Sequence, residues 1–157
     1  MHLTPEDHQH LTAADGYCEL KMYLDADTEL EQITSKRRNL PDVLAVSLKI
    51  YDGMTHVMAK NLVEYDPRNV QWWIALGNAT RWTENLEAAK SILLDGLKKH
   101  PNEAQVHYDL ACYECQLGDL SGSIKRLKKS FKLDPKYRIH ALEDEDLKPL
   151  WLIIGEG

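Results

Sequence analysis

Residues 67–101 read PRNVQWWIALGNATRWTENLEAAKSILLDGLKKHP, and this stretch decides the fold. A proline stands at each end of it, and Pro135 follows after the same interval of 34 residues. On both sides of the polar segment 83–85, apolar residues recur at every third or fourth position, which is the spacing of amphipathic helices. A fixed period of this length is typical of arrays of helical hairpins. The sequence therefore predicts an all-α repeat fold.

The same stretch resembles the tetratricopeptide repeat family, whose large, small and helix-stopping positions are held here by Trp73, Leu76, Gly77, Ala89, Gly96 and Pro101. The resemblance extends less closely to residues 104–137 and to residues 7–40, where Lys21 stands in the place of the turn glycine. It implies one domain over residues 1–157, folded as a right-handed superhelix of antiparallel helix pairs. The expected units are repeats 7–40, 41–69, 70–103 and 104–137, followed by C-terminal capping helices at 138–154.

The second repeat is too short for two helices and a turn. Residues 41–69 number 29, five fewer than the period of 34. The chain either bends near Gly53 or continues as one fused helix over about 41–66. We favour the fused helix because an apolar seam crosses the missing turn without changing phase. This apolar seam consists of Leu44, Leu48, Tyr51, Thr55, Met58, Leu62 and Tyr65.

A fused helix has a consequence for assembly, because its two halves cannot pack against each other within one chain. A second copy of the chain is the simplest partner, with residues 7–53 of one molecule docked on residues 54–157 of the other. A strained or missing hinge turn favours such domain swapping. The sequence therefore predicts a domain-swapped homodimer, whose self-association residues are Leu44, Leu48, Tyr51, Gly53, Thr55, Met58 and Leu62.

The resemblance also implies a concave groove, built from the first helix of each repeat, that binds segments of other proteins. Its candidate residues are Gln71, Asn78, Arg81, Gln105, Tyr108 and Asp109. Asn78 and Arg81 lie one turn apart and can together bind a carboxylate, with Tyr108 as an amphipathic anchor. The family's carboxylate clamp for chaperone C-termini is not matched, so the expected partner is an unknown protein or peptide.

No residue pattern predicts an enzyme. Cys112 and Cys115 have the Cys-x-x-Cys spacing of metal and redox sites, but structural zinc needs four ligands and the sequence has no second pair. The seven histidines form no zinc motif, and no glycine-rich loop for phosphate occurs. We therefore expect no catalytic residues, no metal and no cofactor. Two alternatives stay open: a purely structural dimer without a groove ligand, and a thiol or metal protein that uses Cys112 and Cys115.

Composition and charge limit the expected partners and location. Lys and Arg number 19 against 25 Asp and Glu, which gives a net charge of −6, and the longest basic run is residues 36–38. We expect no nucleic-acid partner, since that affinity depends on neutralising phosphates. The apolar runs are far shorter than the roughly 20 residues of a membrane helix, and residues 1–6 lack the pattern of a signal peptide. These features predict a soluble, cytoplasmic protein without a membrane partner.

An acidic run, residues 143–146, begins the C-terminal part of the chain. Carboxylates are favoured in the first turn of a helix by its dipole, so we expect a solvated helix start here. The apolar face of a terminal cap would then be formed by Leu142, Leu147, Leu150 and Trp151.

Overall fold

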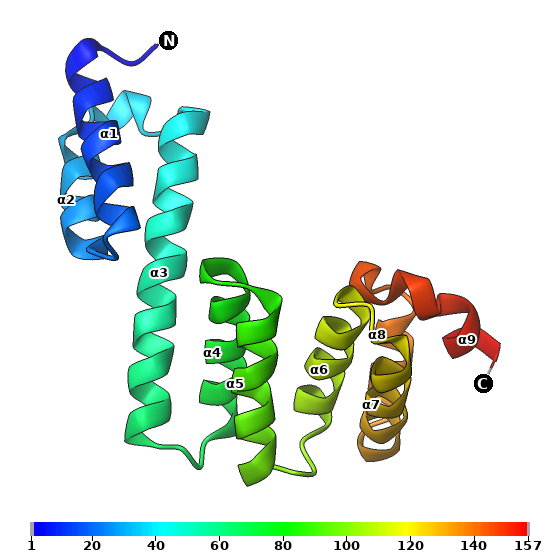
Figure 1. Cartoon of the computed structure of the whole chain (residues 1–157). Coiled ribbons are helices and arrows are strands. Elements are labelled where there is room, and N and C mark those ends of the chain that lie inside the picture. Colours follow the sequence, from blue (N-terminus) through cyan, green and yellow to red (C-terminus); the bar gives the residue numbers. More distant parts are fainter. Residues whose placement is uncertain (1, 157) are drawn as a thin grey trace. The chain divides into compact units, whose positions relative to one another are not determined.

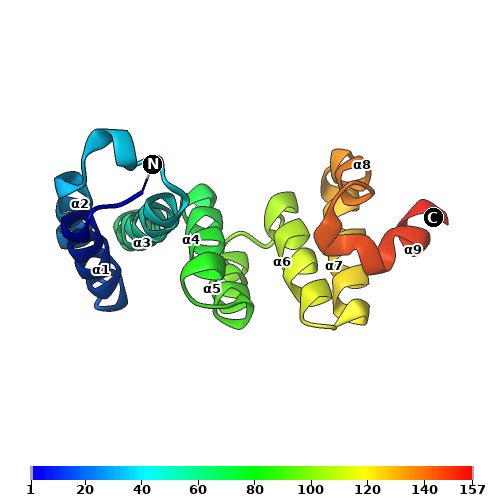
Figure 2. The ribbon, with the colours of Figure 1, turned by 90° about the horizontal axis from the view of Figure 1, so that it is seen from above.

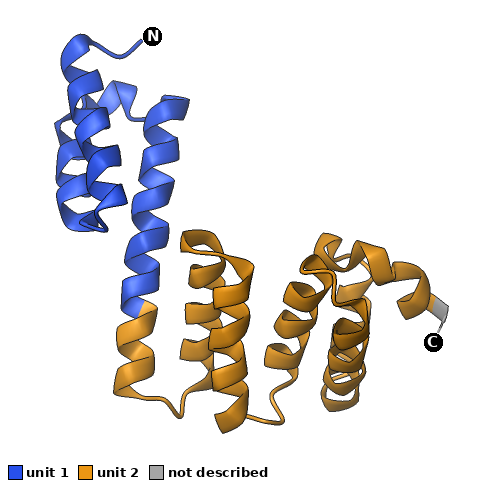
Figure 3. Cartoon of the chain, viewed as in Figure 1, with its two compact units in different colours: residues 1–58 blue, residues 59–157 orange. Residues whose placement is uncertain are grey.

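The computed structural model describes residues 2–156, which form helices, turns and connecting segments and no strand (Figure 1). The all-α prediction is confirmed. The chain divides into two compact units, residues 1–58 and residues 59–157, and the division falls inside helix α3 (Figure 3). Each unit has its own hydrophobic core.

Unit 1 contains two helices, a short 3-10 turn and the first part of a third helix: α1 Pro5–Glu19, α2 Tyr23–Gln32, η1 Ser35–Arg37 and α3 Pro41–Tyr65. Helices α1 and α2 lie side by side in both views (Figures 1 and 2). Lys21, in the connection between them, has a φ of 58°, so it adopts the left-handed conformation that a turn glycine would supply. The core residues of the unit are Ala14, Ala26, Leu30, Ile33, Val43, Val46 and Ile50.

Unit 2 contains the remainder of α3 and a series of helical hairpins: α4 Val70–Thr83, α5 Leu86–Lys99, α6 Ala104–Gln116, α7 Leu120–Leu133, α8 Lys136–Ala141, η2 Glu145–Leu150 and α9 Trp151–Glu156. The connections inside the α4–α5 and α6–α7 hairpins are short because side chains cap the second helix: Asn85 accepts from the Ala88 amide and Asp119 accepts from the Gly122 amide. The two helices of each hairpin pack against each other and run in opposite directions (Figure 1).

The core of unit 2 is built mainly around α6, on which Val106, Leu110 and Tyr113 are almost fully buried. Ile74 of α4 and Leu93 of α5 pack on one side of the same cluster. On the other side the cluster includes Leu127 of α7 and three residues of the C-terminal elements, Leu147, Leu150 and Ile154. The C-terminal elements are thus part of the core.

Helix α3 is helical at every residue from Pro41 to Tyr65, including Gly53. Its origin in two fused repeat helices stays a prediction. Gly53 is buried and faces the Tyr23 side chain, and a Cβ atom added at Gly53 would overlap carbons of the Tyr23 ring. The glycine in the middle of the helix therefore makes room for an aromatic ring, and the helix continues through it.

The close fit between Gly53 and Tyr23 predicts that alanine at position 53 destabilises the protein, although alanine normally stabilises a helix relative to glycine. Alanine is ordinarily about 1 kcal/mol more favourable than glycine inside a helix. Gly53→Ala is instead expected to lower the free energy of unfolding by about 1–3 kcal/mol, because the Tyr23 ring must move. The matched control is Gly16→Ala in α1, where an added Cβ meets nothing within 4 Å. Urea denaturation followed by circular dichroism measures both, and a stabilised Gly53→Ala variant would contradict the close fit.

Candidate interaction surfaces

The apolar seam lies on the surface of each unit. In unit 1, its residues Leu44, Leu48, Tyr51, Thr55 and Met58 are all exposed, with exposed fractions of 62% for Leu48 and 60% for Tyr51. On the part of α3 that belongs to unit 2, Leu62 and Tyr65 are exposed as well. Isolated apolar side chains at a surface are common, but a row of six that recurs at helical spacing is not.

The buried side of α3 is a different set of positions. Val43, Val46 and Ile50 contact the core of unit 1, whereas Ala59 and Val63 contact a small cluster around Trp73 in unit 2. The seam positions fall between these residues and follow the alternating steps of four and three residues that characterise coiled-coil contacts. Each unit therefore buries its own positions of α3, and the seam positions are left at the surface.

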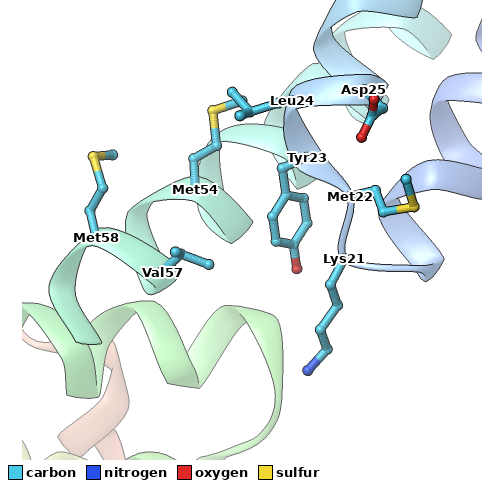
Figure 4. A pocket seen from close by; sticks show the side chains of 8 residues that line it. All are labelled: Lys21, Met22, Tyr23, Leu24, Asp25, Met54, Val57 and Met58. Atoms are coloured by element: carbon cyan, nitrogen blue, oxygen red, sulfur yellow. The ribbon is translucent and has the colours of Figure 1, made fainter. Parts of the chain in front are cut away.

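A cleft of about 410 Å³ opens beside the seam within unit 1, between the start of α2 and the middle of α3 (Figure 4). Tyr23 projects from α2 toward α3 at its centre. Lys21 and Asp25 are the charged residues of its lining, which is otherwise formed by Met22, Tyr23, Leu24, Met54, Val57 and Met58. Methionine is well suited to such a surface because its flexible side chain adapts to different partners.

In unit 2, two of the candidate groove residues bind another part of the same chain. The Arg81 guanidinium on α4 donates two hydrogen bonds to the Asp146 carboxylate, at 2.5 and 3.0 Å. The Tyr108 hydroxyl on α6 donates to Asp144 Oδ2 at 2.8 Å. The hydrogen bonds to Asp146 raise the pKa of Arg81, as expected for a bidentate pair that is only about one quarter exposed.

The expectation of a solvated acidic run is therefore wrong for two of its four residues. Glu143 and Glu145 are exposed, but Asp144 and Asp146 turn toward α4 and α6. The segment is also held by Gln116, which donates to the Asp146 carbonyl at 2.8 Å. The helix start itself is present, since Asp144 caps η2 by accepting from the Asp146 amide at 3.0 Å. The difference arises because tertiary partners, Arg81 for Asp146 and Tyr108 for Asp144, compete with solvent for these carboxylates.

The other candidate groove residues take varied positions. Asn78 is exposed, and its side-chain oxygen accepts from the Tyr113 hydroxyl at 2.9 Å. Gln71 is exposed near the start of α4, and Gln105 is half-buried near the start of α6. The structure therefore brings Arg81 and Tyr108 to one acidic segment. Among the described residues, no hydrogen bond joins that segment to Gln71 or Gln105.

Asp109 lies on α6 beside this acidic segment. Burial and the Asp144 carboxylate raise the pKa of Asp109 to about 7, and Arg81 acts in the opposite direction. Within residues 2–156, no hydrogen-bond partner reaches the buried Asp109 Oδ2 atom. A buried carboxyl oxygen without a partner is costly, so this residue is an unfavourable point in the packing between α6 and the acidic segment.

The two cysteines of the Cys-x-x-Cys pair are buried free thiols. Burial raises the pKa of the Cys112 thiol, and the neighbouring Asp144 and Asp109 carboxylates act in the same direction. Reactive and metal-binding cysteines need the thiolate, which this surrounding disfavours. In the part of the chain that the structure describes, no group of three or more His, Cys, Asp or Glu side chains is arranged to hold a metal ion.

The sequence did not indicate that Asp144 and Asp146 bind two of the candidate groove residues, or that the Tyr113 ring lies beside Arg81. The Arg81 guanidinium lies over the Tyr113 ring at 5.6 Å from its centroid, and Trp82 lies on the same guanidinium at 5.2 Å. One signal in the sequence was available, since two aspartates two residues apart complement the positive charge of Arg81. Nothing local to residues 143–146 shows that they fold back to α4.

Comparison with known proteins adds no identification. The chain matches no protein-family model and no curated protein in sequence. Of the described helices, none is both long and apolar enough to cross a membrane.

Proposed function

We propose that this chain is a protein–protein interaction module of tetratricopeptide type that self-associates as a domain-swapped homodimer through the apolar seam of α3. One observation supports the dimer above all others: every residue of the seam, from Leu44 to Tyr65, is exposed, although other apolar positions of the same helix are already buried. Removing such a row from water is favourable by about 25 cal/mol per Å², so an unpartnered seam favours association.

A second copy of the chain is the proposed occupant because the seam is compatible with itself. Its steps alternate between four and three residues in either direction, so an antiparallel copy presents the same alternation of apolar side chains. The contact is isologous, and each favourable pair therefore occurs twice in a two-fold dimer. The seam itself carries no charged residue, so pairing its side chains with a second seam buries no charge.

The groove of unit 2 is the proposed site for a further partner. Arg81 and Tyr108 supply a charged donor and an amphipathic hydroxyl, which suit a peptide that carries carboxylates. The proposal includes no catalytic step, because the site holds no activated nucleophile and the thiol beside it is held in the protonated form by burial.

Light scattering on the full chain at micromolar concentration tests the dimer. The expected mass is twice that of the 18.0 kDa chain. Insertion of a five-residue turn after Gly53 allows the two halves of α3 to fold back on each other, and this variant is expected to have the mass of one chain. A wild-type protein that remains at the mass of one chain would overturn the proposed dimer.

A further inference from the structure

We infer that the groove of unit 2 is a receptor for an acidic peptide segment, Asp-x-Asp followed by leucine, and that residues 142–151 occupy it as an internal competitor. The inference rests on the proposed interaction function of the groove and is independent of the dimer. Residues 142–151 are called the C-terminal segment below. All the contacts that carry the inference lie within unit 2.

The C-terminal segment contacts the groove as a bound peptide would. Its two aspartates bind two separate helices. Asp146 accepts hydrogen bonds from Nη1 and Nη2 of Arg81 on α4, and Asp144 accepts one from the Tyr108 hydroxyl on α6. Cys112 Sγ also lies 3.6 Å from Asp144 Oδ2. Arg81 and Tyr108 are two of the candidate groove residues, and the segment that binds them also packs against α6 and α9.

Apolar anchors follow the aspartates in the same segment. Leu147 and Leu150 are fully buried in the core cluster that includes Leu110 of α6. Pro149 is exposed between them, and Trp151 folds back so that its ring nitrogen donates to the Asp144 carbonyl at 3.1 Å. The recognised pattern is therefore two carboxylates two residues apart, with a leucine directly after the second and another three residues later.

Asp109 shows that the internal occupant fits imperfectly. Its Oδ2 atom has no hydrogen-bond partner among the described residues, and its neighbour in the segment is another carboxylate, Asp144. Besides Asp144, the groups that face it are Arg81 of α4, Tyr113 of α6 and Tyr137 of α8. A segment that meets an unsatisfied carboxylate is held less tightly than a fully matched ligand, which makes its displacement by a partner feasible.

A labelled peptide with the sequence of residues 142–154 tests the inference on the full chain. The double variant Asp144→Asn, Asp146→Asn weakens the internal competitor by removing its charged hydrogen bonds. Fluorescence anisotropy is expected to show that this variant binds the peptide about tenfold or more tighter than wild type does. Adding Arg81→Ala to the double variant is expected to reverse the gain.

The matched control is Glu143→Gln, Glu145→Gln, which removes the same charge from exposed side chains of the same segment. It is expected to bind the peptide as weakly as wild type. A peptide in which both aspartates are asparagine is expected to lose the affinity for the double variant. Equal peptide binding by the two double variants, or binding that ignores Arg81→Ala, would overturn the inference.

If the double variant does not fold, amide hydrogen exchange measured on the wild-type chain tests the same inference. Excess unlabelled peptide is expected to increase amide exchange in residues 142–151, because the internal segment is displaced. Unchanged exchange at saturating peptide would reject an internal competitor. If the chain has the mass of one molecule and still binds the peptide, the result supports the peptide site of unit 2 and rejects only the dimer. The two proposals can therefore be rejected independently.

Discussion

Leu48→Glu is expected to abolish self-association while each chain stays folded. Leu48 is 62% exposed in the single chain, so glutamate there costs the isolated fold less than about 0.5 kcal/mol. In a dimer that pairs the apolar seam, the same carboxylate is buried against apolar side chains without a partner. Such burial costs several kcal/mol, and a two-fold contact contains it twice, so the dissociation constant is expected to rise by about 100-fold or more.

Ala45→Glu is the matched control, since it adds the same charge to an exposed position of α3 that lies outside the seam. Light scattering is expected to give the mass of one 18.0 kDa chain for Leu48→Glu and twice that mass for Ala45→Glu. Circular dichroism is expected to show the same helical content in both variants. Dimers of equal strength in both would show that association does not use the seam.

Asp109→Asn is expected to stabilise the protein at neutral and higher pH. The pKa of Asp109 is raised to about 7 by burial and by Asp144, above the ordinary value of 3.8 that applies to the unfolded chain. Below pH 3.8 the carboxyl is protonated in both states, and its contribution to stability is fully present. As pH rises toward about 7, the unfolded chain releases the proton first, so stability is lost. Above that range the loss is constant and on the order of a few kcal/mol.

Chemical denaturation at a series of pH values measures this effect as the difference between the variant and wild type. The difference is expected to be small near pH 4, to grow through pH 7 and then to level off, because asparagine does not ionise. Asp95→Asn on the exposed side of α5 is the control for loss of a charge, with an expected change below about 0.5 kcal/mol. A pH-independent difference for Asp109→Asn would contradict the raised pKa.

The helices could be predicted from the sequence because their signals are local. The intervals between prolines, the apolar spacing and the polar segment 83–85 place the hairpins of unit 2 close to where the structure has them. The place of the first turn was also visible, since Lys21 stands where the pattern requires a left-handed residue. The apolar seam was found by its phase alone, and the structure places all seven of its residues at the surface.

The candidate groove could be predicted only in part. The repeat pattern selected Arg81 and Tyr108, but their carboxylate partners lie 65 and 36 residues away in the chain. Gly53 is a second case, because an isolated glycine in a helix indicates either a bend or a close approach. The ring of Tyr23, which decides between the two, belongs to another helix. Pairings of this kind depend on how helices pack and leave no local trace.

The sequence by itself determined the helical hairpins and the apolar seam, since backbone propensity, capping and apolar period act between residues a few positions apart. Only the tertiary structure decided that Asp144 and Asp146 bind Tyr108 and Arg81, and that the Asp109 Oδ2 atom is buried without a hydrogen-bond partner among the described residues. The physical reason is that the ionisation and pairing of a carboxyl group depend on burial and on neighbouring charges, which packing brings together from distant parts of the chain.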